Sequence, residues 1–146
     1  MTIAMNADSL NDFLAREFTQ VGTRYRVEQA GPDLLTARLL VGDESLRPGG
    51  TVSGPAMFGL ADLAVYCAIL SRIGPVALAV TTNASIDFMR KPAAGHDLIA
   101  ECRILKLGRT LAVAEALIFS DGTGQPVARC SMTYSIPPKD RNNRSL

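Results

Sequence analysis

The chain has 146 residues, a length that favours a single domain over residues 1–146. Apolar residues make up 47% and charged residues 20%, so a packed core is expected and disorder is excluded for most of the length. The 15 Lys and Arg residues nearly balance the 14 Asp and Glu residues, and the net charge of +1 removes the main driving force for binding DNA or RNA.

The cysteine content and the N-terminal residues bear on the cellular setting. The chain has three widely spaced cysteines: Cys67, Cys102 and Cys130. An odd number at such spacing does not indicate a disulfide framework, so we expect a reducing, cytoplasmic setting. Residues 1–14 lack the basic start and apolar run of a signal peptide. The only candidate membrane segment, residues 55–70, is shorter than the roughly 20 residues needed to cross a bilayer and contains Asp62. We therefore expect a soluble protein.

The first elements along the chain are a helix and two strands. Apolar residues at i, i+3, i+4 and i+8 predict a short amphipathic helix over residues 9–18. Two strands are predicted over residues 24–30 and 34–41, separated by the turn residues Gly-Pro-Asp at 31–33. A loop rich in turn residues then covers residues 42–54.

The next segment, residues 55–70, is apolar on every side, which predicts a buried helix. Pro55 suits its first turn, and Ser53 or Gly54 can cap it. Four further strands are predicted, over residues 76–89, 98–107, 110–120 and 126–136. The polar tail, residues 139–146, is expected to fray.

The short connections favour antiparallel neighbours, and the break at Gly108-Arg109 favours a tight hairpin. The predicted order is therefore two strands, one buried helix and four strands in a meander. A strongly curved antiparallel sheet wrapped around the helix is an economical way to bury it, with a second subunit covering what remains. The sequence thus predicts an α+β fold with one central helix.

Asp62 is a charged residue in the middle of this apolar helix. None of its helical neighbours at i−4, i−3, i+3 or i+4 has a positive charge. A buried carboxylate is costly unless it is hydrogen-bonded, protonated or next to a wet cleft. Two interpretations follow: a structural Asp that accepts hydrogen bonds from a neighbouring loop or strand, or a general base or nucleophile in a partly apolar cleft. The physical argument leaves both open.

The start of the same helix offers free N–H groups to an anion or a developing oxyanion. Gly54 is the best candidate because it has no side chain and Pro55 has no N–H. Asp62 lies eight residues later, about 12 Å along the helix axis, so a carbonyl bound at Gly54 meets it only if the chain bends there. The alternative is that Gly54 is an ordinary cap or turn glycine.

The sequence SGPAMFGLADLA, at residues 53–64, resembles the helix-start motif of hotdog-fold acyl-CoA thioesterases, in the branch similar to phenylacetate-pathway enzymes. That motif is H-G-G-x-x-x-x-L-x-D. Gly54 matches its first Gly and Asp62 its acidic residue, whereas Ser53 replaces the His and Pro55 the second Gly. Later segments, at residues 80–95, 106–116 and 124–136, are similar to the later strands of the family.

The resemblance implies a hotdog fold, at least dimeric, as a homodimer or homotetramer with the active site between subunits. It implies that Asp62 activates water or attacks the thioester, that the Gly54 N–H polarises its carbonyl, and that the Thr81 hydroxyl positions water. Asp62 of one chain would face residues of the other near Thr81. The substrate would be an acyl-CoA, hydrolysed to the free acid and coenzyme A without a cofactor or metal.

Ser53 is also expected to orient the reactants. The candidate substrate-binding residues are Arg47 (where the family often has Asn), Met57, Phe58, Leu60, Arg90 and Arg109. The two last arginines would meet the phosphates of coenzyme A, although solvated loop charges are the simpler interpretation. The replacements at Ser53 and Pro55 motivate an alternative function, a non-catalytic acyl-CoA or fatty-acyl binding or sensing protein.

Two other chemistries have less support in the sequence. A hydratase of the same architecture usually requires an Asp-His pair, and the only histidine, His96, is poorly placed for it. A Cys67–His96 pair is conceivable, but an inert buried thiol and a surface turn histidine explain these residues better. One histidine and scattered cysteines do not form a metal site of the usual spacing.

Overall fold

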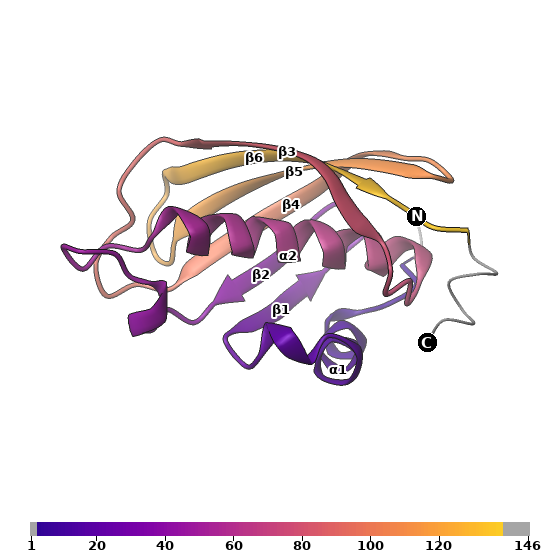
Figure 1. The fold of residues 1–146 in the computed structure, drawn as a ribbon, viewed down its shortest axis with the longest axis horizontal. Coiled ribbons are helices and arrows are strands. Elements are labelled where there is room, and N and C mark those ends of the chain that lie inside the picture. Colours follow the sequence, from indigo (N-terminus) through magenta and orange to yellow (C-terminus); the bar gives the residue numbers. More distant parts are fainter. Residues whose placement is uncertain (1–2, 139–146) are drawn as a thin grey trace.

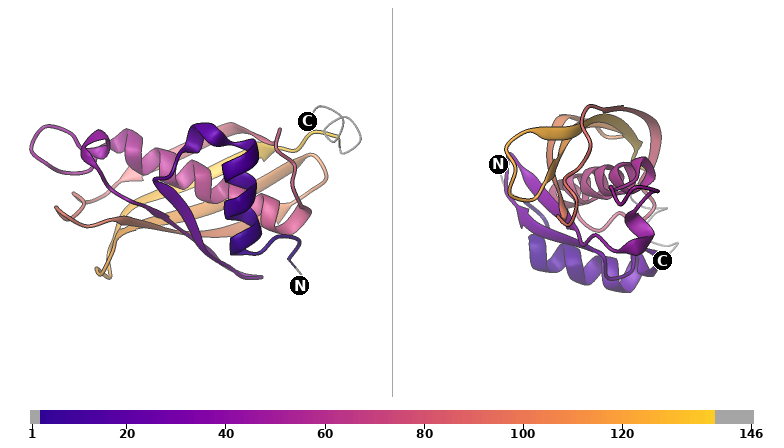
Figure 2. Two further views of the ribbon diagram at one scale, coloured as in Figure 1. Left: turned by 90° about the horizontal axis from the view of Figure 1, so that it is seen from below. Right: turned by 90° about the vertical axis from the view of Figure 1, so that its left-hand side faces the viewer.

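A long central helix, α2 (Gly54–Ile73), is enclosed by a curved six-stranded antiparallel sheet (Figures 1 and 2). The computed structural model describes residues 3–138. The strands are β1 (Tyr25–Ala30), β2 (Leu35–Leu39), β3 (Val80–Phe88), β4 (Leu98–Leu107), β5 (Leu111–Ser120) and β6 (Pro126–Ser135). Their order across the sheet is β1-β2-β4-β5-β6-β3. The short helix α1 (Ala7–Glu17) and the 3-10 turn η1 (Thr19–Val21) pack at the β1 end of the molecule, and a second 3-10 turn, η2 (Asp43–Ser45), precedes α2.

The central helix confirms the prediction of a buried, all-round apolar segment. Ser53 caps it, with its side chain accepting a hydrogen bond from the Ala56 N–H, and Pro55 lies in the first turn. The helix ends at Ile73, three residues beyond the predicted end, and Gly74 follows in a left-handed conformation (φ +98°). With 20 residues the helix is long and apolar enough to cross a membrane, but 67% of its apolar window is buried inside the fold, as in a core helix.

The strand β3 departs from the predicted meander. β4, β5 and β6 do follow one another as antiparallel neighbours, but β3 pairs with β6, and β4 pairs with β2 instead. The connection at residues 89–97 crosses the end of the sheet near the start of α2 (Figure 1). Nine residues reach about 30 Å, whereas three strand spacings need only about 14 Å. The assumption that a short connection joins neighbouring strands was therefore wrong here.

The other boundaries lie close to the predicted ones. The helix α1 begins at Ala7, earlier than expected, because Asn6 and Ser9 form a capping box. β3 begins four residues later than predicted because residues 74–79 form hydrogen-bonded turns. The β4–β5 hairpin has a three-residue loop, closed by the Gly108 N–H donating to the Leu111 carbonyl, rather than the predicted two-residue turn. The predicted frayed tail lies outside the described residues.

Candidate active site

Asp62 lies in the middle of α2, half-buried, and one of its oxygens accepts two hydroxyl hydrogen bonds. The hydroxyls of Thr81 and Tyr134 each donate to Asp62 Oδ1 over 2.6 Å. The Tyr134 hydroxyl also lies 3.1 Å from the Asp62 backbone carbonyl oxygen. Within residues 3–138 no cation forms an ion pair with Asp62, and its Oδ2 has no hydrogen-bond partner. The carboxylate is thus fixed through one oxygen, and the other is free to meet a reactant.

The register of the sheet brings these two hydroxyls together. Thr81 in β3 is directly opposite Tyr134 in β6, and both side chains lie on the face toward α2. The outward neighbours Val80 and Ser135 form the adjacent pair. Burial, and then the charge of Asp62, raise the pKa of Tyr134 well above its usual range. Tyr134 therefore keeps its proton near neutral pH and acts as a hydrogen-bond donor.

A hollow of about 160 Å³ adjoins Asp62, and we call it the aspartate hollow. It is lined by Phe18, Val21, Tyr25, Gly59, Asp62, Leu63, Tyr66 and Tyr134. The rings of Phe18 and Tyr66 meet edge to face, 5.5 Å apart. Gly59 leaves room for Tyr25, since a Cβ at this position would lie 2.9 Å from the Tyr25 hydroxyl and would displace it. Asp62 is thus both tethered by neighbouring strands and open to a cavity, so the two interpretations of this residue are compatible.

A second hollow, of about 380 Å³, lies at the start of α2, and we call it the glycine hollow. It is lined by Arg47, Thr51, Val52, Gly54, Met57, Phe88, Met89, Arg90, Lys91 and Pro92. The Gly54 N–H donates to no acceptor within residues 3–138, and a Cβ there would come within 3.3 Å of the Phe88 ring. Four predicted site residues, Gly54, Arg47, Met57 and Arg90, therefore lie together, and Lys91 brings the number of cationic side chains that line this hollow to three.

Comparison with known proteins identifies the family. Residues 49–127, more than half of the chain, match the family model of the Thioesterase superfamily. The chain belongs to the thioesterase superfamily. Its six-stranded sheet and central helix are the hotdog fold of the thioesterases to which it is similar, so the resemblance stated above is confirmed for family and fold.

Three relatives illustrate the range of similarity. A candidate thioesterase from Silicibacter sp. TM1040, solved by crystallography, is 52% identical, with 94% of this chain and 96% of that chain covered and a TM-score of 0.88. A mutant of the phenylacetic acid degradation protein PaaI from Thermus thermophilus is 25% identical, with 82% and 98% covered and a TM-score of 0.69. A candidate esterase from Deinococcus radiodurans is 37% identical over 83 residues, 57% of this chain and 54% of the esterase. The chain thus spans about half the length of that curated relative.

In this thioesterase-family chain the Thr81 hydroxyl contacts Asp62 of the same chain. It does so because β3 begins directly beside the middle of α2, so its inward side chains meet that helix. The expectation that Asp62 faces residues near Thr81 of a second chain stays a prediction. The side chain of Ser53 caps α2 through the Ala56 N–H, a structural use of its hydroxyl.

Three predicted substrate contacts lie away from both hollows. Leu60 is fully buried in the core, and Phe58 packs against the core without lining either hollow. Arg109 is exposed in the β4–β5 loop, at the end of the sheet where β3 begins, whereas Arg90 follows the end of β3. Eight steps of about 3.3 Å separate these ends by about 26 Å, so the two arginines do not share a site in one chain.

Cys67 and His96 lie in very different surroundings. Cys67 is fully buried, and burial raises the pKa of its thiol, whereas His96 is exposed and its Nδ1 lies 2.8 Å from the Asp121 carbonyl oxygen. These two residues therefore do not form a catalytic pair. In the part of the chain that the structure describes, no group of three or more His, Cys, Asp or Glu residues could hold a metal ion. Tyr134 is the site residue that the sequence analysis missed.

Proposed function

We propose that this member of the thioesterase superfamily hydrolyses acyl-CoA thioesters to free acids and coenzyme A. Family membership supports a thioester hydrolase acting on a small-molecule substrate. The observation on which the finer proposal depends is the half-buried Asp62 carboxylate, held at Oδ1 by Thr81 and Tyr134 and adjoining a hollow. A carboxylate fixed in this way has one oxygen free to act as a base or a nucleophile.

The reaction needs only Asp62, water and the thioester. As a base, Asp62 accepts a proton from a water molecule while the water oxygen adds to the thioester carbonyl carbon. The carbon–sulfur bond then breaks, and the proton passes to the leaving thiolate, which restores the carboxylate. As a nucleophile, Asp62 Oδ2 would form an anhydride with the acyl group and release the thiolate, and water would then hydrolyse the anhydride. Neither route requires a cofactor.

The two hollows suit different parts of such a substrate. The aspartate hollow, with its aromatic lining, suits the acyl group. The glycine hollow offers the Gly54 N–H to the developing oxyanion and the charges of Arg47, Arg90 and Lys91 to the phosphates of coenzyme A. These hollows share no lining residue, and Gly54 and Asp62 are about 12 Å apart along α2. A single thioester carbonyl does not reach both within one chain.

A second copy of the chain would complete the site, and β3 is suited to bind it. This strand lies at the edge of the sheet, seven of its nine residues are exposed, and none is buried. It contains one charged residue, Asp87, and no proline, so it lacks the usual protection of an exposed edge. Its unpaired backbone groups can bind a second β3 strand in antiparallel orientation.

Such pairing would bring the two kinds of hollow together. If two β3 strands pair symmetrically about Ala84 and Ser85, Thr81 of one chain lies opposite Phe88 of the other. Thr81 contacts Asp62, and the ring of Phe88 lies against Gly54. The aspartate hollow of each protomer would thus adjoin the glycine hollow of its partner, in a homodimer with two equivalent sites.

The test is an acyl-CoA panel assayed for free thiol, with Asp62→Asn as the key variant. We expect kcat to fall roughly 100- to 10,000-fold, the range typical for loss of a general base, with the fold retained. Asp12→Asn, the same change on the exposed face of α1, is the matched control and should leave turnover unchanged. Full turnover by Asp62→Asn would contradict the assignment of Asp62, and saturable acyl-CoA binding without thiol release would favour the non-catalytic binding protein.

A further inference from the structure

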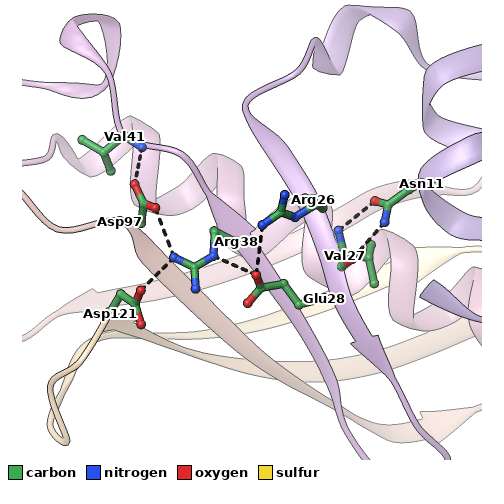
Figure 3. A network of polar contacts seen from close by, with 8 residues as sticks. All are labelled: Asn11, Arg26, Val27, Glu28, Arg38, Val41, Asp97 and Asp121. Carbon is green, nitrogen blue, oxygen red and sulfur yellow. Dashed lines mark hydrogen bonds and ion pairs between the residues drawn. The ribbon is translucent and has the colours of Figure 1, made fainter. Parts of the chain in front are cut away.

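The glycine hollow is walled by two loops that are joined at their bases. The loop at residues 42–53 provides Arg47, and the connection at residues 89–97 provides Arg90, in both cases with further lining residues. Val41 immediately precedes the first loop, and Asp97 is the last residue of the second. The Val41 N–H donates to Asp97 Oδ1 over 3.0 Å (Figure 3).

Arg38 in β2 holds the other oxygen of this carboxylate. Its Nη1 lies 3.1 Å from Asp97 Oδ2 and 2.8 Å from Asp121 Oδ2, and its Nε lies 2.8 Å from Glu28 Oε2 (Figure 3). The Asp121 N–H also donates to the Asp97 carbonyl oxygen. Both side-chain oxygens of Asp97 are therefore used, one by Arg38 in β2 and one by Val41 at the start of the first loop.

These contacts are more shielded from water than an ordinary surface ion pair. The Arg38 side chain is 18% exposed, whereas Arg129 and Asp87, which pair on the same sheet, are 65% and 56% exposed. Exposed pairs contribute little because water and salt screen them. A mostly buried guanidinium with several carboxylate partners holds its geometry better. Asp97 is thus fixed in position, and it in turn fixes the base of each loop.

We infer that Asp97, oriented by Arg38, is a positioning residue for the coenzyme A end of the substrate, an inference that rests on the proposed function. It sets the spacing of the two loops and hence of Arg47 and Arg90 across the glycine hollow. These cations would hold the phosphates equally in the ground state and the transition state. Loss of the link should therefore raise KM with little effect on kcat. The contacts of Asp62 with the hydroxyls of Thr81 in β3 and Tyr134 in β6 do not involve these loops and would remain intact.

The test compares Asp97→Ala with Asp97→Asn. Asparagine keeps an acceptor for the Val41 N–H and loses only the ion pair, whereas alanine removes both contacts. We expect Asp97→Ala to raise KM for a responsive acyl-CoA roughly tenfold, which corresponds to losing one charge-assisted contact to phosphate. Asp97→Asn, which keeps the contact to Val41 but loses the ion pair with Arg38, should raise KM by a smaller factor. Glu28→Gln is the matched control, since Glu28 is a partner of Arg38 in β1 that contacts neither loop.

Hydrogen exchange provides a readout independent of catalysis. In Asp97→Ala, peptides over residues 42–53 and 89–97 should exchange faster, whereas those over α2 should not. An unchanged KM, or equal KM changes in Asp97→Ala and Glu28→Gln, would overturn the inference, as would unchanged exchange in both loops. If the unmodified protein releases no thiol from any acyl-CoA, the proposed function fails, and the exchange result alone decides whether Asp97 links the loops.

Discussion

At the scale of single residues, the site depends on two hydroxyls that converge on one oxygen of Asp62. Thr81 and Tyr134 are more than 50 residues apart in the sequence but come from strands that are neighbours in the sheet. Each hydroxyl bond to a charged group contributes roughly 1.5–3 kcal/mol, so together they hold the carboxylate in one orientation. Their removal should affect the chemical step more than substrate binding.

We predict that Tyr134→Phe and Thr81→Val each lower kcat roughly tenfold, with KM nearly unchanged, because a misoriented Asp62 raises the barrier by about 1.4 kcal/mol. Thr81→Ser, which keeps the hydroxyl, should retain most of the activity. The matched control is Thr82→Val, since the Thr82 hydroxyl lies on the exposed side and donates to the Thr133 carbonyl rather than to Asp62. Steady-state kinetics on one acyl-CoA would check this, and an effect of Thr82→Val equal to that of Thr81→Val would contradict it.

The sequence indicated Asp62 because a lone charge in an apolar helix requires an explanation, and Gly54 because of its place at the helix start. It did not indicate Tyr134, because an inward tyrosine in an alternating strand has the pattern of a core residue. Recognising it requires the register between β3 and β6, which no local pattern specifies. The separation of Arg109 from Arg90 within one chain could not be predicted for a similar reason, since charge and loop position do not reveal the end of the sheet on which a loop lies.

At the scale of elements, Arg38 joins β2 to β1 through Glu28, and to the β3–β4 and β5–β6 connections through Asp97 and Asp121 (Figure 3). Hydrogen bonding and charge from Arg38, with a smaller contribution from Arg26, lower the pKa of Glu28, although its burial opposes the shift. A lowered pKa in the folded state means that the ionised Glu28 stabilises the fold.

This stabilisation is complete above the unfolded-state pKa of Glu, roughly 4.3, and is lost as the pH falls through the lower folded-state value. We predict that the Tm of the protein falls more steeply than that of Glu28→Gln as the pH is lowered from about 7 to about 3. Glu17→Gln, an exposed change on α1 outside this network, should follow the unmodified protein. Thermal melts across this pH range would check it, and parallel curves for all three proteins would contradict it.

Most element boundaries could be predicted from local patterns, since alternation, apolar runs and turn residues are local properties. The partner of β3 could not, because the connection after it is long enough to reach several strands. The central helix is covered on both sides because the sheet curves around it and places β3 on the far side from β1, as Figure 2 shows. That arrangement is a requirement of the whole core and is not encoded in any one segment.

At the scale of the whole molecule, the unpaired edge of β3 and the separation of the two hollows lead to one expectation, a site shared between two copies. Each site would take Asp62 from one chain and the cationic glycine hollow from the other. This division can be tested, because two chains with different defects can form one intact site when they are combined in a dimer.

We predict that Asp62→Asn and Arg90→Glu, each weakly active alone, regain activity when unfolded and refolded together. A mixed dimer contains one site with both intact halves and one site with both defects, so each mixed dimer should approach half of the unmodified activity. Co-refolding Asp62→Asn with Asp62→Asn/Arg90→Glu is the control and should restore nothing. Thiol release by the refolded mixtures would measure this, and the absence of any gain would show that each chain forms its site alone.

The pairing of β3 with β6 also has a consequence for biosynthesis. When β3 leaves the ribosome, its partner strand, which begins 38 residues after β3 ends, has not yet emerged. Until β6 has emerged, one side of α2 remains uncovered. The apolar helix and the unpaired edges of β3 are then exposed together in the nascent chain. Such long-range closure is slow and favours aggregation. Cells that overproduce this chain should therefore depend on holding chaperones during its translation more than its small size suggests.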